Sequence, residues 1–313
     1  MFEGGRLAVI VPAYNEGSLI AHALSKIADY ADYIIVVDDG STDDSAKTVE
    51  KISEKDKRIT LIRHDANRGV GAALSTGYLK ARELEADYAI VMAGDAQMDG
   101  RHIPKLLKPI VSGEADYVKG NRLVGSNARR GMPKFRLLGN SILTFLTKVC
   151  SGYWDIMDPQ NGYTAASRQV IETIDWEGMY PRYGYPNDLL IKLNAAGFKV
   201  ADANIPAVYG MEKSKIRYAT YIPKVSLILL RGFAWRLWEK YVIRSFHPLV
   251  LFYLMGFTLI PISILTAAYL AYLRFYVVGG ITATSALIPI FLFTTGLQSL
   301  FFAMLFDMEA GKK

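Results

Sequence analysis

The chain has 313 residues, of which 51% are hydrophobic, and its mean hydropathy is +0.16. This length allows one sizeable core, and the apolar surplus is concentrated in the C-terminal part of the chain. A single cysteine, Cys150, excludes an internal disulfide, and the four scattered histidines lack the spacing of a zinc site. This composition fits a reducing, cytoplasmic setting.

The formal net charge is +6 and the pI is about 9.1, a balance that suits either nucleic acid or an anionic membrane as a partner. The excess basic residues gather just before the C-terminal apolar runs, rather than in a sheet studded with aromatic side chains. We therefore expect contact with membrane lipids and no binding of nucleic acid.

Short apolar runs alternate with helical patterns in the first hundred residues. The predicted strands are 7–11, 33–37, 59–62 and 88–93, and the helices between them, the first capped by Ser18, end near 29, 54 and 84. Helix crossovers of this kind predict an α/β fold with a doubly wound, mostly parallel sheet. The loops at the carboxyl ends of its strands would share one edge, where such sheets bind ligands.

Polar loops follow the first two predicted strands. They read Pro12-Ala-Tyr-Asn-Glu16 and Asp38-Asp-Gly-Ser-Thr-Asp43. Asp38 or Asp39 can accept hydrogen bonds from the donor edge of uracil or guanine, and Glu16 can meet a ribose hydroxyl. An ordinary capped turn is the alternative for the second loop. The chain lacks a phosphate-loop lysine motif and a triple-glycine dinucleotide motif, which disfavours an ATP-hydrolysing or nicotinamide enzyme.

The fourth predicted strand ends in Gly94-Asp-Ala-Gln-Met-Asp99. Asp95 and Gln97 lie two residues apart, so in an extended chain both side chains point to the same side. This pair suits a divalent cation, Mg or Mn, that carries substrate phosphates. A solvated acidic turn is the alternative.

Basic residues mark the acceptor half that we expect after residue 100. Four arginines lie close together in a glycine-rich stretch that does not predict one continuous helix: Arg122, Arg129, Arg130 and Arg136. Because guanidinium groups bind phosphate in a two-pronged fashion, these are candidates for the phosphate of an acceptor. A solvated basic loop at the bilayer surface is the alternative.

An aromatic segment runs from Tyr180 to Asp188 and contains two prolines. It precedes a predicted helix over 189–196, and its rings suit stacking on a sugar. Asp188 closes this segment at the start of the predicted helix. A helix cap is the alternative role for Asn187 and Asp188, because these residue types are favoured there.

The C-terminal part predicts a membrane anchor. Over 213–246 basic and apolar residues sort onto opposite helical faces, which indicates interfacial amphipathic helices. The runs 248–273 and 275–306 have no charged residue, and each is long enough to span a bilayer. Lysines and arginines before the first run and at Lys312-Lys313 predict an integral membrane protein whose catalytic domain and termini are cytoplasmic. We thus expect domains at 1–212, with halves 1–100 and 101–212, at 213–246 and at 247–313.

Four motifs, in their order and spacing, resemble family 2 glycosyltransferases, and among them the dolichyl-phosphate mannose and glucose synthases. They are Val9 to Glu16, Val36 to Asp43, Asn67 to Gly71 and Gly94 to Asp99. The resemblance covers about residues 7–218 and implies a glycosyltransferase-A type, Rossmann-like catalytic domain. It also implies an inverting, metal-dependent hexosyl transfer.

The resemblance assigns roles to individual positions. The nucleotide-binding positions of the family match Pro12, Tyr14, Glu16, Asp38, Asp39 and Asp95. The metal-binding positions match Asp95 and Gln97, and the catalytic base matches Asp188. Ala93 stands where the family has the first metal-binding acid, so either Asp99 or Asp39 compensates, or cation binding is weak.

The combined expectation is a membrane-bound enzyme that moves a hexose, mannose first and glucose next, from a nucleotide diphosphate sugar to a polyprenyl or dolichyl phosphate. It would feed protein or cell-surface glycosylation. One alternative is elongation of a lipid-linked glycan, and another is a cellulose-synthase-like polysaccharide synthase. A nucleotide-sugar-binding scaffold without catalysis is a third alternative, because Ala93 permits it. The sequence leaves the nucleotide base, the product anomer and the oligomeric state open.

Overall fold

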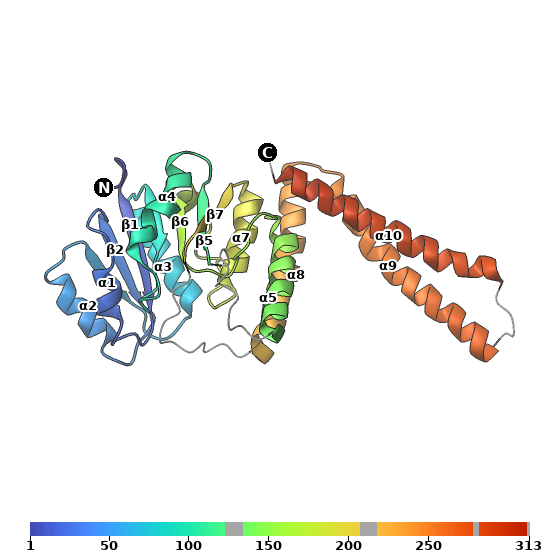
Figure 1. Ribbon diagram of the computed structural model, residues 1–313, viewed down its shortest axis with the longest axis horizontal. Helices are drawn as coiled ribbons and strands as arrows, with labels where there is room; N and C mark the ends of the chain where they lie inside the picture. The colour runs from blue at the N-terminus through green and yellow to red at the C-terminus, as the bar shows by residue number, and fades with distance from the viewer. Residues whose placement is uncertain (123–133, 207–217, 278–281, 312–313) are drawn as a thin grey trace. The chain divides into compact units, whose positions relative to one another are not determined.

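The computed structural model of the protein describes residues 1–122, 134–206, 218–277 and 282–311. The chain divides into two compact units, Met1–Phe233 and Ala234–Lys313. The first unit is a layered α/β domain, and the second is built from long helices (Figure 1).

One sheet of seven strands organises the first unit, in the order β3-β2-β1-β4-β6-β5-β7. The strands are β1 Leu7–Ala13, β2 Tyr33–Asp38, β3 Ile59–Arg63, β4 Tyr88–Val91, β5 Tyr117–Asn121, β6 Thr164–Ser167 and β7 Val200–Asn204. β6 is antiparallel to both of its neighbours, and every other pair is parallel. The expected doubly wound, mostly parallel sheet is confirmed.

Helices cover both faces of this sheet. One face is covered by α1 Ile20–Ser25, α2 Ser45–Ser53 and α4 Ile103–Val111, which follows the short η1 Gly100–His102, and the other by α3 Val70–Glu83, α6 Arg168–Thr173 and α7 Tyr185–Ala196. Two further helices are α5 Lys134–Ser151, which packs against α7, and α8 Tyr218–Trp238. Successive strand residues point to opposite faces, so Leu7 and Val9 pack in the cluster with α1, α2 and α4. Ala8 and Ile10 pack in the other cluster, with α3, α6 and α7. The sheet is thus buried on both sides.

Three helices differ from the sequence predictions. The first helix begins after Leu19 and ends at Ser25, so Ser18 is not its cap. α7 begins at Tyr185 with Gly184 as N-cap, because Pro186 fits the first turn of a helix. α5 was not predicted, yet its internal glycine, Gly139, has open space around it and is simply tolerated. The sequence of residues 207–209 also predicts a strand, and this segment lies outside the described residues.

The second unit contains the end of α8, the π-helical turns η2 Glu239–Arg244 and η3 Leu273–Val277, and the helices α9 Leu249–Tyr272 and α10 Ala283–Ala310. α9 and α10 lie side by side in Figure 1, and Gly256 permits their close approach, since a Cβ there would lie 2.4 Å from the Leu300 side chain. The segments Leu249–Val277 and Thr284–Ala310 are long and apolar enough to cross a membrane.

A buried ion pair lies within the second unit. Both Arg236 and Asp307 have fully buried side chains, and two guanidinium nitrogens of Arg236 donate to the two carboxylate oxygens over 2.9 and 2.8 Å. The Tyr241 hydroxyl donates to the same carboxylate over 2.7 Å. Breaking a buried pair of this kind is costly, so it ties the end of α8 to α10.

Candidate active site

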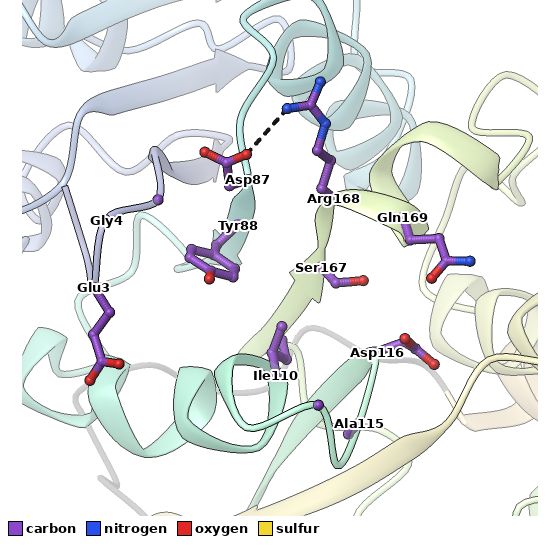
Figure 2. Close-up of a pocket in the computed structure, with 12 residues that line it drawn as sticks. Glu3, Gly4, Asp87, Tyr88, Ile110, Ala115, Asp116, Ser167, Arg168 and Gln169 are labelled. Carbon is purple, nitrogen blue, oxygen red and sulfur yellow. Dashed lines mark hydrogen bonds and ion pairs between the residues drawn. The ribbon is translucent and has the colours of Figure 1, made fainter.

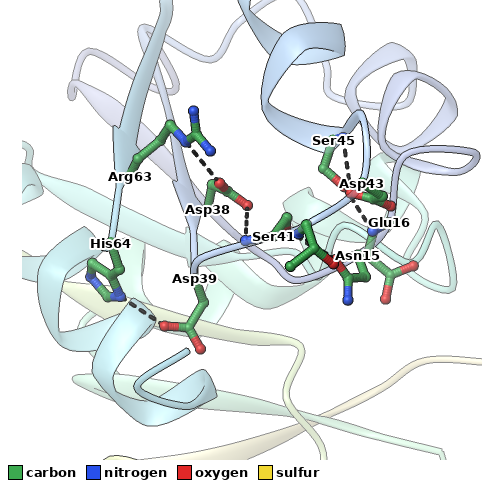
Figure 3. A network of polar contacts seen from close by, with 10 residues as sticks. Asn15, Glu16, Asp38, Asp39, Ser41, Asp43, Ser45, Arg63 and His64 are labelled. Atoms are coloured by element: carbon green, nitrogen blue, oxygen red, sulfur yellow. Dashed lines mark hydrogen bonds and ion pairs between the residues drawn. The ribbon is translucent and has the colours of Figure 1, made fainter. Parts of the chain in front are cut away.

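The loops after β1 and β2 are joined by hydrogen bonds at the carboxyl edge of the sheet (Figure 3). The backbone N–H of Asn15 donates to Ser41 Oγ, and the N–H of Glu16 donates to Ser45 Oγ, both over 2.9 Å. The Asn15 side chain accepts in return from the N–H of Thr42. The loop that contains Pro12, Tyr14 and Glu16 is therefore held against the Asp38–Asp43 loop, as the shared edge predicts.

Asp38 ends β2 with a carboxylate that is bound within the chain. One oxygen accepts from the Ser41 N–H and the other from Arg63 Nε, each over 3.2 Å. The residue is only 1% exposed, whereas the Arg63 side chain is 54% exposed. A nucleobase would thus reach Asp38 only if Arg63 moved.

Asp39 turns the other way and holds the loop before α3 (Figure 3). It accepts from the N–H groups of Arg68 and Gly69 over 2.9 and 2.7 Å, and from His64 Nδ1 over 2.8 Å. His64 Nε2 lies 3.0 Å from the Thr76 hydroxyl. With 2% exposure and three donors, Asp39 is a structural brace for the Asn67–Gly71 motif in this structure. Sequence reasoning missed Arg63 and His64, although their position at the end of β3, beside β2, was a usable signal.

The loop after β4 contains the expected cation ligands. Asp95 Oδ1 accepts from the backbone N–H of Gln97 over 3.0 Å, which makes a tight turn with Ala96 at φ +58°. Gly94 lies against the end of β1, because its N–H donates to Pro12 O over 3.1 Å. Asp95 and Gln97 thus belong to the same edge as the nucleotide loops.

Asp99, one of the two acids that the sequence offers in place of the one missing at Ala93, is paired with Arg101 in this structure. Its carboxylate takes a two-pronged contact from Arg101, with Nη2–Oδ2 2.6 Å, and caps η1 through the Arg101 N–H. The Arg101 side chain lowers the pKa of Asp99 to about 2. Among the residues that the structure describes, no group of three or more histidines, cysteines, aspartates or glutamates is arranged to hold a metal ion.

Asp95 and Gln97 nevertheless fit a divalent cation of one particular kind. Mg usually keeps several waters and binds through one or two carboxylates together with substrate phosphates, not in a cage made by protein alone. One carboxylate and one amide oxygen satisfy that requirement. The site fits a cation that the substrate helps to hold.

On the acceptor side, Arg122 is held by Asp158. Arg122 Nε lies 2.8 Å and Nη2 3.2 Å from the two carboxylate oxygens of Asp158, which is 5% exposed. Arg129 and Arg130 lie outside the described residues, and so does the side chain of Arg136 in the first turn of α5. The structure therefore locates one member of the predicted arginine cluster.

Lys119 is a buried cation in the same region that sequence reasoning missed. Its ammonium donates to the carbonyl of Asn161 over 2.8 Å, and burial lowers its pKa to about 8. Asp202, which pairs with Lys119 in the register of β7 and β5, has a raised pKa for the same reason. A lysine in an apolar strand gives no signal of its burial from sequence alone.

Asp188 lies in the first turn of α7, but it is not the N-cap. Its Oδ2 accepts from the Tyr180 N–H over 2.9 Å and lies 3.2 Å from the ammonium of Lys192. Asn187 is fully buried and accepts from Thr147 and Gln160. The predicted capping role of both residues is wrong, and Asp188 instead holds the aromatic segment in place.

That aromatic segment packs on the start of α3. Pro181 O accepts from the Ala72 N–H over 3.0 Å. A Cβ on Gly71 would lie 2.1 Å from Tyr180 O, so only glycine permits this contact. Backbone contacts therefore connect the Asn67–Gly71 motif to Asp188, across the two halves of the domain.

A pocket of about 540 Å³ lies at the opposite edge of the sheet (Figure 2). It is lined by residues at the start of β4 and the end of the antiparallel β6, including Tyr88, Ser167 and Arg168. Asp87 in its wall accepts from the Arg6 N–H over 2.8 Å and from Arg168 over 3.2 Å. These internal contacts occupy the Asp87 carboxylate, and the pocket does not belong to the candidate active site.

The chain is similar to known proteins in both its sequence and its fold. A family profile described as Glycosyl transferase family 2 matches residues 8–175. The UDP-N-acetylglucosamine–dolichyl-phosphate N-acetylglucosaminyltransferase of Methanococcus voltae is 30% identical over 214 residues, 64% of this chain and 85% of the relative. The polyprenol monophosphomannose synthase of Mycolicibacterium smegmatis is 29% identical over 240 residues, 72% of this chain and 88% of the relative.

Solved structures share the fold. Glucosyl-3-phosphoglycerate synthase from Mycobacterium tuberculosis, in complex with Mn²⁺, UDP-glucose and phosphoglyceric acid, has a TM-score of 0.57 at 22% identity, over 74% of this chain and 80% of that chain. Mannosyl-3-phosphoglycerate synthase from Rubrobacter xylanophilus has a TM-score of 0.55 at 16% identity, over 78% of this chain and 77% of that chain. These likenesses confirm the glycosyltransferase-A type of fold.

Proposed function

Because this chain belongs to family 2 of the glycosyltransferases, we propose that it moves a sugar from a nucleotide diphosphate to a lipid phosphate at the cytoplasmic face of a membrane. The observation that carries the proposal is that the polar loops after β1, β2 and β4 share one sheet edge in a chain with two apolar helices. One of the two relatives described above is named for dolichyl-phosphate and the other for polyprenol monophosphomannose, which supports a lipid phosphate acceptor.

The transferred sugar is a hexose or an N-acetylhexosamine. Mannose and then glucose are the sequence-based choices, and the M. voltae relative, named for UDP-N-acetylglucosamine, adds a third candidate. The donor's base would lie near the Asp38–Asp43 loop, where Arg63 covers Asp38. Binding of the base would therefore require Arg63 to leave Asp38 or to share in the contact.

The proposed reaction is one displacement at the anomeric carbon. An oxygen of the lipid phosphate forms the new bond as the bond to the diphosphate breaks, which inverts the anomer. A Mg or Mn ion held by Asp95 and Gln97 would neutralise charge on the departing diphosphate. A phosphate at neutral pH needs little or no deprotonation, so Asp188 serves here by holding Tyr180 rather than as a required base.

Arg122 is the described candidate for binding the acceptor phosphate. Asp158 fixes its guanidinium through two nitrogens, while 45% of the side chain remains exposed. A preoriented guanidinium loses less conformational freedom when it binds phosphate. Asp158 therefore acts as a positioning residue for Arg122.

Exposed apolar side chains support a membrane location. In the first unit, α5 exposes Ile142 and Phe145, and α8 exposes Leu230 at 65%. Leu143 of α5 and Val225 of α8 belong to one apolar cluster with Ile191 of α7. Large side chains of α9 and α10 are exposed along their length, as expected for helices that face lipid. The excess of basic residues before α9 supports cytoplasmic termini.

The test is donor turnover by the full chain in detergent. Release of nucleoside diphosphate would be measured from GDP-mannose, UDP-glucose and UDP-N-acetylglucosamine, with and without polyprenyl phosphate, in Mn, Mg or chelator. We expect release that needs the cation, rises with the lipid, and falls at least about 100-fold in Asp95→Ala, because charge stabilisation on the leaving group is lost. Nucleotide binding without release under every condition would instead favour the scaffold alternative.

A further inference from the structure

Lys119 of β5 is a buried cation that precedes Arg122 closely in the chain. The residue is only 1% exposed, so its ammonium does not reach a bound substrate. The ammonium donates to the backbone carbonyl of Asn161 over 2.8 Å. Burying a charge is costly unless other groups compensate it, so an apolar side chain would suit the interior of this strand better if packing were its only role.

The segment that Lys119 contacts is the turn formed by residues 158–162. Asn161 fastens this turn to β5, because its side-chain amide donates to the carbonyl of Gly120. Within the turn, the Asn161 N–H donates to the carbonyl of Asp158 over 3.2 Å. Two side chains, those of Lys119 and Asn161, therefore connect β5 to the turn that carries the Asp158 carboxylate.

The charges around Lys119 balance. Burial lowers the pKa of Lys119 to about 8, while the carboxylates of Asp158 and Asp202 oppose this shift and Arg122 adds to it. Asp158 gives both of its oxygens to Arg122, over 2.8 and 3.2 Å. Without the ammonium, two largely buried carboxylates would share one guanidinium, which favours protonation of one of them. A protonated Asp158 could not accept from Arg122 through both oxygens in the same way.

We propose that Lys119 is a positioning residue for the phosphate of the lipid acceptor. It fixes the turn through Asn161 and keeps Asp158 ionised, and Asp158 in turn holds Arg122. This inference rests on the proposed function, since it takes the lipid phosphate as the ligand of Arg122. Binding of the acceptor would thus depend on a side chain that touches no substrate.

The first test is steady-state kinetics of the full chain in detergent, with the donor and polyprenyl phosphate varied in turn. Lys119→Met replaces the ammonium by an apolar side chain of similar shape. We expect the KM for polyprenyl phosphate to rise by about fivefold, while the KM for the donor stays unchanged. Lys119→Gln keeps a hydrogen-bond donor but loses the charge, and it should give a smaller rise. Equal rises of both KM values in Lys119→Met would show a general disturbance and would overturn the proposal.

A double-mutant cycle tests whether Lys119 acts through Asp158. Because Asp158→Asn already weakens the hold on Arg122, adding Lys119→Met to it should raise the KM for polyprenyl phosphate by less than about twofold further. Independent contributions would instead multiply, so the same fivefold rise in the Asp158→Asn background would contradict this route.

Lys26→Met is the matched control. The Lys26 ammonium also donates to a backbone carbonyl over 2.8 Å, that of Ala96 in the loop after β4. Its loss should leave the KM for polyprenyl phosphate unchanged. If this KM rose as much as in Lys119→Met, the effect would not be specific to Lys119 and the proposal would be wrong.

Chemical labelling separates this inference from the proposed function, because it needs neither substrate. Phenylglyoxal modifies accessible guanidinium groups, and mass spectrometry of the peptide that contains Arg122 gives the rate. We expect Arg122 to react at least about twofold faster in both Lys119→Met and Asp158→Asn than in the natural chain. Fast labelling in Asp158→Asn alone would overturn the role of Lys119. If labelling follows the expectation but the natural chain shows no turnover with polyprenyl phosphate, the proposed function fails while the positioning of Arg122 stands. Thermal unfolding of each variant checks that it is folded.

Discussion

Two regions of the first unit hold their carboxylates in different ways. We call them the donor edge, which is the proposed nucleotide region around Asp38 and Asp39, and the acceptor edge, which is the proposed lipid-phosphate region around Arg122 and Asp158. At the donor edge, Asp39 is bound mainly by backbone N–H groups, those of Arg68 and Gly69. At the acceptor edge, Asp158 is bound by the guanidinium of Arg122, close to the buried ammonium of Lys119. Two backbone N–H groups hold Asp39 at the first edge, together with the His64 ring, and charged side chains hold Asp158 at the second.

This difference has a consequence for how each edge responds to change. Backbone N–H groups do not titrate, so the contacts that they make at the donor edge do not change with pH. Buried charges depend on each other and on protonation, because an unpaired buried charge is costly. We therefore expect mutations at the donor edge to act mainly on stability, and mutations at the acceptor edge to act on substrate binding and on pH dependence.

The largest effect is expected for Asp39→Ala. The substitution leaves the N–H groups of Arg68 and Gly69 and the ring of His64 without their acceptor in a buried place. Several unsatisfied donors should lower the free energy of unfolding by about 3 kcal/mol. Denaturant unfolding in detergent measures the loss. Asp39→Asn keeps one acceptor oxygen, so its free energy of unfolding should fall by less. An equal fall in both variants would contradict the role of Asp39 as a structural brace.

A smaller loss is expected at the junction between the two halves. In Gly71→Ala the new methyl group would lie 2.1 Å from Tyr180 O, so the aromatic segment must shift. Overpacking of this kind costs about 2 kcal/mol. Gly139→Ala is the matched control, since Gly139 is also helical but has open space around it, and alanine there should stabilise α5 by about 0.5 kcal/mol. Thermal unfolding that ranks the two variants in the opposite order would refute this contact.

At the acceptor edge, Asp158→Asn tests the positioning of Arg122. The amide keeps the volume but loses the charge that fixes the guanidinium. We expect the KM for polyprenyl phosphate to rise by about tenfold, because a charge-assisted contact is worth roughly 1.4 kcal/mol or more, while the KM for the donor stays unchanged. Steady-state kinetics with each substrate varied in turn measures both constants. A rise in the donor KM alone would argue against the assignment of this edge to the acceptor.

The sequence predicted the first four strands of the sheet, because strand and helix periodicities alternate regularly up to residue 93. Apolar runs such as Leu7–Val11 are buried on both faces and read as strands without ambiguity. It failed at α5, since its start follows glycines that pointed to a loop, and it placed the start of α7 at 189 instead of Tyr185, since both prolines were assigned to the aromatic segment before the helix. Both failures concern residues whose meaning depends on their position within a turn.

The candidate site was predictable in position but not in its contacts. The motifs indicated which loops meet, and the structure brings Asn15, Ser41 and Gly94 to one edge as expected. What the carboxylates bind was not predictable, because the partners His64 and Arg101 carry no motif of their own. Asp38 and Asp39 are adjacent in sequence, yet their side chains take separate partners from β3 and from the loop before α3.

The last prediction concerns Lys119 and separates the two edges by pH. Burial lowers its pKa to about 8 from 10.5, so between these values the unfolded chain holds a proton that the folded chain has released. Stability therefore rises with pH in this window, whereas below pH 8 both states are protonated and the cost of burying the charge is present in full. The gain is at most about 1.4 kcal/mol per pH unit. Denaturant unfolding from pH 7 to about 10 should show the free energy of unfolding of the natural chain rising relative to that of Lys119→Met, which cannot titrate there. Parallel pH profiles for the two proteins would mean that the ammonium of Lys119 is not buried as a charge, and the acceptor edge would then resemble the donor edge.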